Sequence, residues 1–121
     1  MTILVVDDDK DTLEVLTEYL RTKLDDEFLE ASSAKQAIDL YKDNEIEMTI
    51  IDAIMPDYDG FYTLKRIRKL NPKAKIIMAT GDLTSDMESN IKKHKANGII
   101  LKPYEIDTVI DEIVKVSKEM N

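Results

Sequence analysis

Several side chains able to bind a cation stand directly after short apolar runs of this 121-residue sequence. The acids Asp7 and Asp8 follow the run 3–6, and Asp52 follows the run 48–51. A hydroxyl, Thr80, and an ammonium, Lys102, follow two later apolar runs. Carboxylate oxygens are ligands of hard divalent cations, and Mg²⁺ suits a site with a few carboxylates completed by water and phosphate.

Each of these residues also has an ordinary explanation. The acidic run Asp7–Asp9 could cap a helix and complement its dipole. The joint arrangement is harder to explain in this way. Acids gathered at one place repel one another and lose hydration unless a cation compensates them. We therefore interpret the set as a candidate cation site.

The apolar runs predict the sheet that positions these residues. They are mostly continuous rather than alternating, which is typical of parallel strands covered on both faces; they are 3–6, 48–51, 76–79 and 99–101. A fifth run, 28–31, mixes polar and apolar residues and is predicted to be an edge strand. Segments with helical periodicity separate the runs. Five strand–helix units predict an α/β fold with a doubly wound parallel sheet, formed by one domain over residues 1–121.

The helix boundaries carry their own signals. Asp9 is a predicted N-cap, and Ser33 with Gln36 is a predicted capping box. Asn71-Pro72 is predicted to end the third helix, and Ser85 with Glu88 to open the fourth. The apolar faces predicted for the first, third and fifth helices are Leu13, Leu16, Leu20; Phe61, Leu64, Ile67, Leu70; and Ile106, Val109, Ile110, Ile113, Val114.

Ligands of open α/β sheets bind outside the carboxyl ends of the strands, near the point where the strand order reverses. The acids, Thr80 and Lys102 all follow predicted strands, so we expect them to meet at one edge of the sheet.

Four blocks of the sequence resemble a family. They are Val5–Asp8, Ile51–Gly60 with the pattern Asp-x-x-Met-Pro-x-x-Asp-Gly, Ala79–Gly81 and Leu101–Tyr104. In this order and at this spacing they are similar to the CheY-like receiver domain of two-component response regulators, over essentially the whole chain. The resemblance implies a five-stranded (βα)5, flavodoxin-like fold with strand order 2-1-3-4-5.

The resemblance also implies a role for each site residue. Asp52 matches the phosphoacceptor, which takes a phosphoryl group from a sensor histidine kinase or a phosphotransfer protein. Asp7 and Asp8 match the pair that holds Mg²⁺, together with Asp52 and the backbone carbonyl of Ile54. Thr80 matches the hydroxyl that hydrogen-bonds the phosphoryl group. Lys102 matches the lysine of the family, with a cis peptide expected before the proline that follows. Such transfer needs positioning and positive charge more than covalent chemistry.

Two positions depart from the family pattern. Ile99 stands where an aromatic residue often lies, which puts in doubt a relay from Thr80 to that residue. Ile54 stands where fast-cycling relatives often have a polar residue, so an aliphatic side chain is expected to slow loss of the phosphoryl group. The resemblance further implies a downstream protein partner at the face formed by the fourth helix, fifth strand and fifth helix, near Ile99 and Tyr104. A homodimer formed on phosphorylation is left open.

Composition limits the function. The net charge of −8 argues against nucleic-acid binding by this chain alone. No apolar run approaches the ~18 residues of a membrane span. The chain has no cysteine and no signal-peptide pattern, which suits the cytoplasm.

Two other functions fit part of this pattern. A Mg²⁺-dependent aspartyl-phosphate hydrolase of haloacid-dehalogenase type also places an Asp after a strand, but it needs a second acid two residues later, where this chain has Ile54. A receiver-shaped interaction module that is never phosphorylated would not need all five site residues. We therefore expect a phosphoacceptor signalling protein that catalyses only its own phosphorylation and dephosphorylation.

Overall fold

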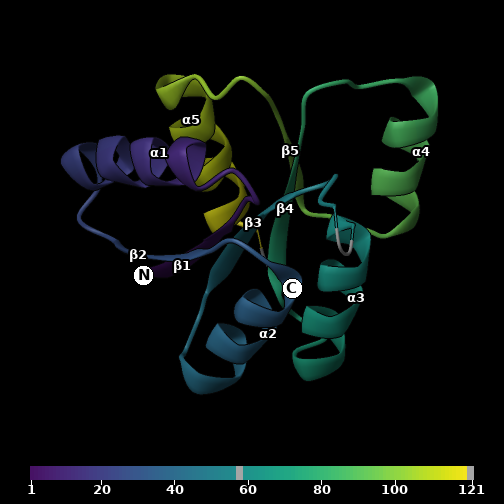
Figure 1. Ribbon diagram of the computed structural model, residues 1–121, viewed down its shortest axis with the longest axis horizontal. Helices are drawn as coiled ribbons and strands as arrows, with labels where there is room; N and C mark the ends of the chain where they lie inside the picture. Colours follow the sequence, from purple (N-terminus) through teal and green to yellow (C-terminus); the bar gives the residue numbers. More distant parts are fainter. Residues whose placement is uncertain (57–58, 120–121) are drawn as a thin grey trace.

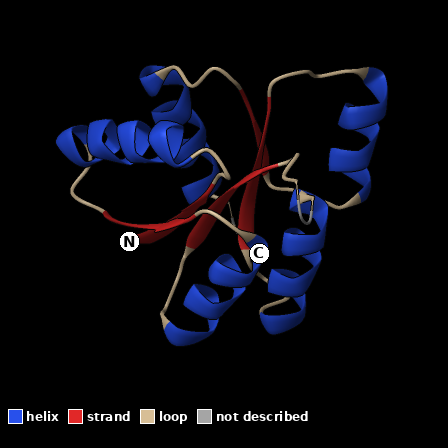
Figure 2. Cartoon of the chain, viewed as in Figure 1, coloured by secondary structure: helices blue, strands red, loops and turns tan. Residues whose placement is uncertain are grey.

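The computed structural model describes residues 1–56 and 59–119. Asp57 and Tyr58 of the Asp-Gly motif lie outside the described residues. Strands and helices alternate along the chain (Figures 1 and 2). The strands are β1 (Thr2–Val6), β2 (Glu27–Ala31), β3 (Met48–Asp52), β4 (Lys75–Thr80) and β5 (Gly98–Leu101). The helices are α1 (Lys10–Lys23), α2 (Ala34–Asp43), α3 (Gly60–Leu70), α4 (Ser85–Lys93) and α5 (Ile106–Ser117).

The sheet is parallel, with strand order β2-β1-β3-β4-β5, as predicted. The mixed run 28–31 lies in β2 at an edge. Only two of the five residues of β2 are buried, whereas every residue of β3 is buried. An edge strand has one neighbour, so it tolerates polar residues that a central strand does not.

Helices cover both faces of the sheet, and a hydrophobic layer lies between each face and its helices, so the fold is doubly wound (Figure 1). Leu4 and Val6 of β1 point into the layer covered by α2, α3 and α4. Ile3 and Val5 point into the layer covered by α1 and α5. Successive residues of a strand face opposite sides, so a strand buried on both faces needs a continuous apolar run.

The helix caps agree with the sequence in part. Asp9 caps α1 by accepting from the N–H groups of Asp11 and Thr12. Ser33 caps α2, but Gln36 returns to the N–H of Ser32 rather than of Ser33, so the predicted capping box is wrong by one residue.

The predicted opening of α4 also needs a correction. The helix begins at Ser85, but the capping oxygen belongs to Thr84, which accepts from the N–H of Met87 at 3.1 Å. Ser85 already has a helical position, so its own hydroxyl is not the cap.

Two predicted apolar faces end differently from the sequence pattern. Leu70, the last residue of α3, is 45% exposed. Val114 is 39% exposed, whereas Val116 is fully buried with Val109 and Ile113. The buried face of α5 therefore consists of Val109, Ile113 and Val116, and the predicted face was wrong in including Val114. None of the helices in residues 1–56 and 59–119 is long and apolar enough to cross a membrane.

Candidate functional site

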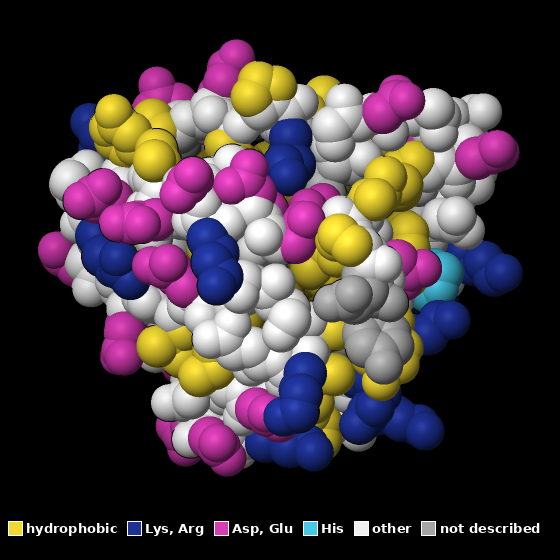
Figure 3. Space-filling view, in the orientation of Figure 1, with side chains coloured by type: hydrophobic (Ala, Val, Ile, Leu, Met, Phe, Trp, Pro, Cys, Tyr) yellow, Lys and Arg dark blue, Asp and Glu magenta, His cyan; other side chains and the backbone are white. Residues whose placement is uncertain are grey.

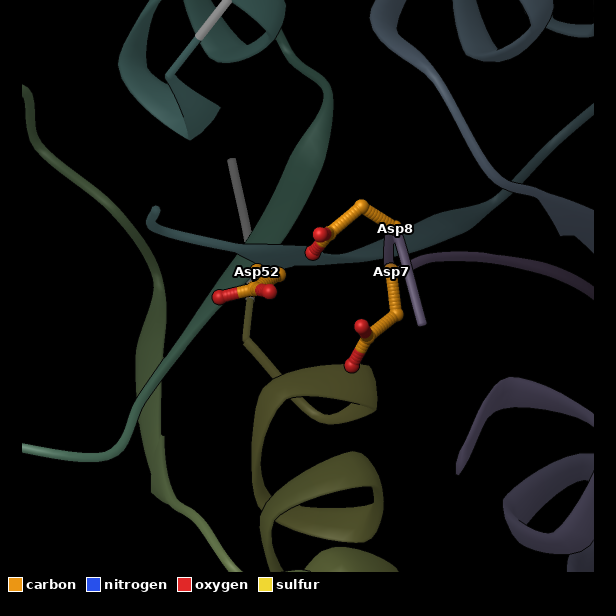
Figure 4. A group of neighbouring side chains, drawn as sticks. All are labelled: Asp7, Asp8 and Asp52. Atoms are coloured by element: carbon orange, nitrogen blue, oxygen red, sulfur yellow. The ribbon is translucent and has the colours of Figure 1, made fainter. Parts of the chain in front are cut away.

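Three carboxylates meet at the carboxyl ends of β1 and β3. Asp52 is the last residue of β3, and Asp7 follows β1. Val6 pairs with Ile51 in the sheet register, which sets these acids side by side. Asp7, Asp8 and Asp52 each offer a carboxylate oxygen, and these three oxygens lie within 4.8 Å of one another. Figure 4 shows the three side chains directed toward a shared space. The convergence predicted from the sequence is present.

Burial separates the three acids. Asp7 is 0% exposed and Asp52 is 6% exposed, whereas Asp8 is exposed to solvent. A pair of buried carboxylates without compensating positive charge is unfavourable, because ionised groups lose their hydration when they are buried. The site therefore requires a cation, and the chain supplies one.

That cation is Lys102, directly after β5. Its Nζ lies 3.0 Å from Oδ2 of Asp7 and 3.3 Å from Oδ2 of Asp52, and the side chain is 23% exposed. Its position follows from the sheet, because Leu101 pairs with Thr80 and the N–H of Lys102 donates to the carbonyl of Thr80 at 2.8 Å. The peptide between Lys102 and Pro103 is cis, as expected.

Hydrogen bonds from the backbone orient the two buried acids. The N–H of Asp9 donates to Oδ1 of Asp7 at 3.0 Å, and the N–H of Ile54 donates to Oδ1 of Asp52 at 3.2 Å. Each carboxylate is thus held by a main-chain donor on one oxygen and by Lys102 on the other. Held in this way, the carboxylates keep one orientation.

Burial dominates the titration of Asp52. It raises the pKa of this carboxyl from 3.8 to about 6, although the charge of Lys102 lowers the pKa. Burial also lowers the pKa of Lys102, but the hydrogen bond to Asp7 and the charges of both acids outweigh it, so that the net shift is upward. A simple ion pair would lower the pKa of the acid; here the loss of hydration is the larger effect. One ammonium does not fully compensate two acids.

Gly60 is required by the close approach of its backbone to the end of β3. A Cβ at this position would lie 2.2 Å from the backbone oxygen of Asp52, and the N–H of Gly60 donates to the carbonyl of Ala53 at 2.9 Å. Any side chain here would push α3 away from the end of β3. This contact gives the physical reason for glycine at the end of the Asp-Gly motif.

In the described part of the chain, the hydroxyl of Thr80 makes no hydrogen bond to the acids. Thr80 is buried at the end of β4, and its Oγ1 accepts from the N–H of Asp82 at 3.3 Å. The side chain of Ile54 is 65% exposed. A cleft of about 750 Å³ opens beside Asp8, between the loops after β2 and β3, and is lined by Asp8, Ser32, Ser33, Ala34, Lys35, Met55 and Pro56.

Sequence reasoning missed one residue of the site. Tyr104 was expected near a partner-binding face, but its hydroxyl donates to Oδ2 of Asp7 at 3.2 Å. Its pKa is raised, first by burial and then by the charges of Asp7 and Asp52. The available signal was its position two residues after Lys102, in the same loop at the carboxyl end of the sheet.

Comparison with known proteins shows the family of the chain. The family described as "Response regulator receiver domain" matches residues 3–114. The chain belongs to the response regulator receiver family. Receiver domains of this family are signalling phosphoacceptors that take phosphoryl groups from histidine kinases, rather than enzymes that turn over a separate substrate.

Individual receiver proteins match over nearly the whole chain. Chemotaxis protein CheY of Halobacterium salinarum is 31% identical over 117 residues, 94% of each chain. Chemotaxis protein CheY of Bacillus subtilis is 29% identical over 113 residues, 93% of this chain and 94% of that protein. The response regulator TrrA of Thermotoga maritima, solved in complex with Mg²⁺-BeF, is 28% identical with a TM-score of 0.83, covering 95% of this chain and 97% of that one.

The acids fit the metal that receiver domains bind. Receiver domains hold Mg²⁺ at an acidic cluster. Here three carboxylate oxygens within 4.8 Å of one another form a hard-oxygen donor set, and the exposed side chain of Asp8 leaves one side open to water and phosphate. The donor chemistry of Asp7, Asp8 and Asp52 therefore suits Mg²⁺.

Proposed function

We propose that Asp52 accepts a phosphoryl group from the phosphohistidine of a sensor histidine kinase or phosphotransfer protein. The supporting observation is a buried, oriented carboxylate at a strand end, with an ammonium 3.3 Å away and two further acids beside it. Asp7, Asp8, Asp52 and the backbone carbonyl of Ile54 would hold the Mg²⁺ ion. The bound ion supplies positive charge to the phosphoryl oxygens.

The residues of the chain then have separate tasks. An oxygen of Asp52 forms a bond to phosphorus while the bond from phosphorus to the donor's imidazole nitrogen breaks, and the electron pair stays on the imidazole. The N–H of Ile54 holds the other side of the carboxylate in place. Lys102, already 3.3 Å from Asp52, neutralises charge on the equatorial oxygens. Positioning and electrostatics thus account for the chemistry that the site must perform.

The acidity of Asp52 is compatible with this role. With a pKa of about 6, most of the carboxyl is ionised near neutral pH and able to act as a nucleophile. A bound divalent cation adds positive charge beside the acid and favours the ionised form further.

A switch follows from the residues around the acceptor. We propose that the hydroxyl of Thr80 donates to the phosphoryl group once it is present, giving up its hydrogen bond to the carbonyl oxygen of Asp82. Phosphorylation changes a conformational equilibrium only through contacts that differ between the two states. Ile99 is partly buried against the core, so the change would pass through the backbone of the loop after β4 rather than through an aromatic side chain.

The face formed by α4, β5 and α5 is the proposed site for the downstream protein. Leu101 of β5 is 52% exposed, which gives this face an apolar contact. The same face could pair two phosphorylated copies.

For the Thr80→Ala variant we expect phosphorylation to persist, while the affinity for the partner no longer rises on phosphorylation. An undiminished rise would refute the switch.

Other features of the proposal concern the chain as a whole. We propose that residues 1–121 form one receiver domain that acts in the cytoplasm. Acidic side chains spread over much of the face in Figure 3, whereas basic side chains gather at the lower right, over α2 and α3. With a net charge of −8, the chain is not suited to bind nucleic acid alone.

Phosphorylation by acetyl phosphate tests the function directly. Wild type with Mg²⁺ is expected to gain the mass of one phosphoryl group, and to gain none in EDTA. Asp52→Asn is expected to gain none. Asp107→Asn, which changes an exposed acid of α5, is a matched control and should behave as wild type. A wild type that stays unmodified would favour a receiver-shaped interaction module.

A further inference from the structure

Asp7 is the most completely held of the three acids. The carboxylate is 0% exposed, and both of its oxygens accept hydrogen bonds. Oδ1 accepts from the N–H of Asp9, while Oδ2 accepts from the hydroxyl of Tyr104 at 3.2 Å and from Nζ of Lys102 at 3.0 Å. The proposed function explains the Lys102 contact, but it uses no phenol.

The two donors to Oδ2 differ in what else they contact. Lys102 also contacts Asp52 and is the group that would meet a phosphoryl group, so its contact with Asp7 is shared. The hydroxyl of Tyr104 donates to Asp7 and carries no charge. It can therefore fix the direction of the Asp7 carboxylate without adding positive charge that would repel a divalent cation.

The ring of Tyr104 is itself held in place. It packs against the hydrophobic layer under α1 and α5, and its centroid lies 5.6 Å from Nζ of Lys102. It also lines an apolar cleft of about 550 Å³ together with residues of α1 and the start of α5, among them Val15, Leu16 and Ile106. Packing against this layer holds one side of the ring and directs its hydroxyl toward Asp7.

We propose that Tyr104 is a positioning residue for the metal site, which orients Asp7 through the phenol hydroxyl. The inference rests on the proposed function, because it takes Asp7 as a ligand of Mg²⁺. Hydrogen bonds to metal-binding side chains hold them in the geometry that the metal needs, and losing one typically weakens binding about 10- to 100-fold. Tyr104 thus belongs to the site, although it contacts neither the acceptor nor the phosphoryl group.

The variant Tyr104→Phe isolates the hydroxyl, because it keeps the ring and its packing. Calorimetric titration with MgCl₂ is expected to give a dissociation constant about 10-fold higher than in wild type. Tyr41→Phe is the matched control: it removes another phenol hydroxyl, which accepts from Asn71 at 3.2 Å and lies in the layer of α2 and α3. The control should bind Mg²⁺ as wild type does. An unchanged or lower dissociation constant for Tyr104→Phe would overturn the inference.

A kinetic measurement separates positioning from general damage to the fold. With acetyl phosphate as donor, the Mg²⁺ concentration that gives half the maximal rate should rise about 10-fold in Tyr104→Phe, while the rate at saturating Mg²⁺ stays that of wild type. A lower maximal rate with an unchanged half-saturating concentration would contradict the role. If wild type itself fails to bind Mg²⁺, the proposed function fails with the inference. If wild type binds and Tyr104→Phe matches it, only the inference fails.

Discussion

Replacing Asp52 with Asn should make the metal-free protein more stable near neutral pH. The folded protein raises the pKa of this carboxyl from 3.8 to about 6, mainly by burial. The difference of roughly two units is worth about 3 kcal/mol, at about 1.4 kcal/mol per unit. Because the amide of Asn must also be buried, we expect a net gain of about 2 kcal/mol in the free energy of unfolding. The ionised carboxylate of Asp52 would then lower the stability of the metal-free protein.

The pH dependence gives this prediction its sign. Since the folded pKa is raised, the protonated acid carries no penalty below about pH 4, and the penalty grows as pH rises through about 6. Urea denaturation in EDTA should therefore show Asp52→Asn about 2 kcal/mol more stable than wild type near pH 8, with the gap closing toward pH 4. Asp107→Asn, at an exposed position, should show no such gap. A wild type more stable than Asp52→Asn at pH 8, or a gap independent of pH, would refute the reasoning.

Three further substitutions probe the surroundings of Asp52. Lys102→Met removes the ammonium between two buried acids and should lower the free energy of unfolding in EDTA by about 2 kcal/mol, measured by urea denaturation; an unchanged midpoint would contradict this. Gly60→Ala places a Cβ 2.2 Å from the backbone oxygen of Asp52 and should lower the free energy of unfolding by about 2 kcal/mol or more, measured by thermal unfolding. Gly81→Ala is the control, because its Cβ would have no atom within 4 Å, and it should lower the free energy of unfolding by less than about 0.5 kcal/mol. Ile54→Asn changes a side chain that is 65% exposed, so the fold should persist while the phosphorylated form decays faster than wild type; equal decay, followed by intact mass, would exclude a shielding role for Ile54.

Much of the site could be predicted because it depends on topology. Asp52 ends β3 and Lys102 follows β5, and parallel strands in a doubly wound sheet present their carboxyl ends at one edge. Continuous apolar runs identified those strands, and the register of β1 with β3 then sets Asp7 beside Asp52. No side-chain detail is needed for this step.

The contact of Tyr104 with Asp7 could not be predicted in the same way. Its direction depends on the path of the chain after Lys102 and on the packing of the ring against the hydrophobic layer under α1 and α5, which no local pattern encodes. The helix faces show a similar limit. Periodicity identifies an apolar face, but tertiary packing decides which of its residues are buried, so Leu70 is exposed and Val116 replaces Val114 in the core.

The pKa of Asp52 shows why sequence patterns underestimate burial. Reasoning from charges alone predicts an acid with a low pKa, kept ionised by nearby cations. The structure places that acid at 6% exposure with one ammonium shared between two carboxylates, and the loss of hydration dominates. A bound divalent ion would reverse this balance, which links metal binding to the reactivity of the acceptor.

Chemical mapping of the phosphorylated residue tests the central claim most directly. The unaltered chain is treated with acetyl phosphate and Mg²⁺, reduced with borohydride, digested and sequenced by tandem mass spectrometry. An acyl phosphate is reduced to an alcohol, so the account predicts homoserine at position 52 and aspartate at positions 7 and 8. Homoserine at another aspartate, or an unreduced residue 52 in protein that carries the phosphoryl group, would contradict it.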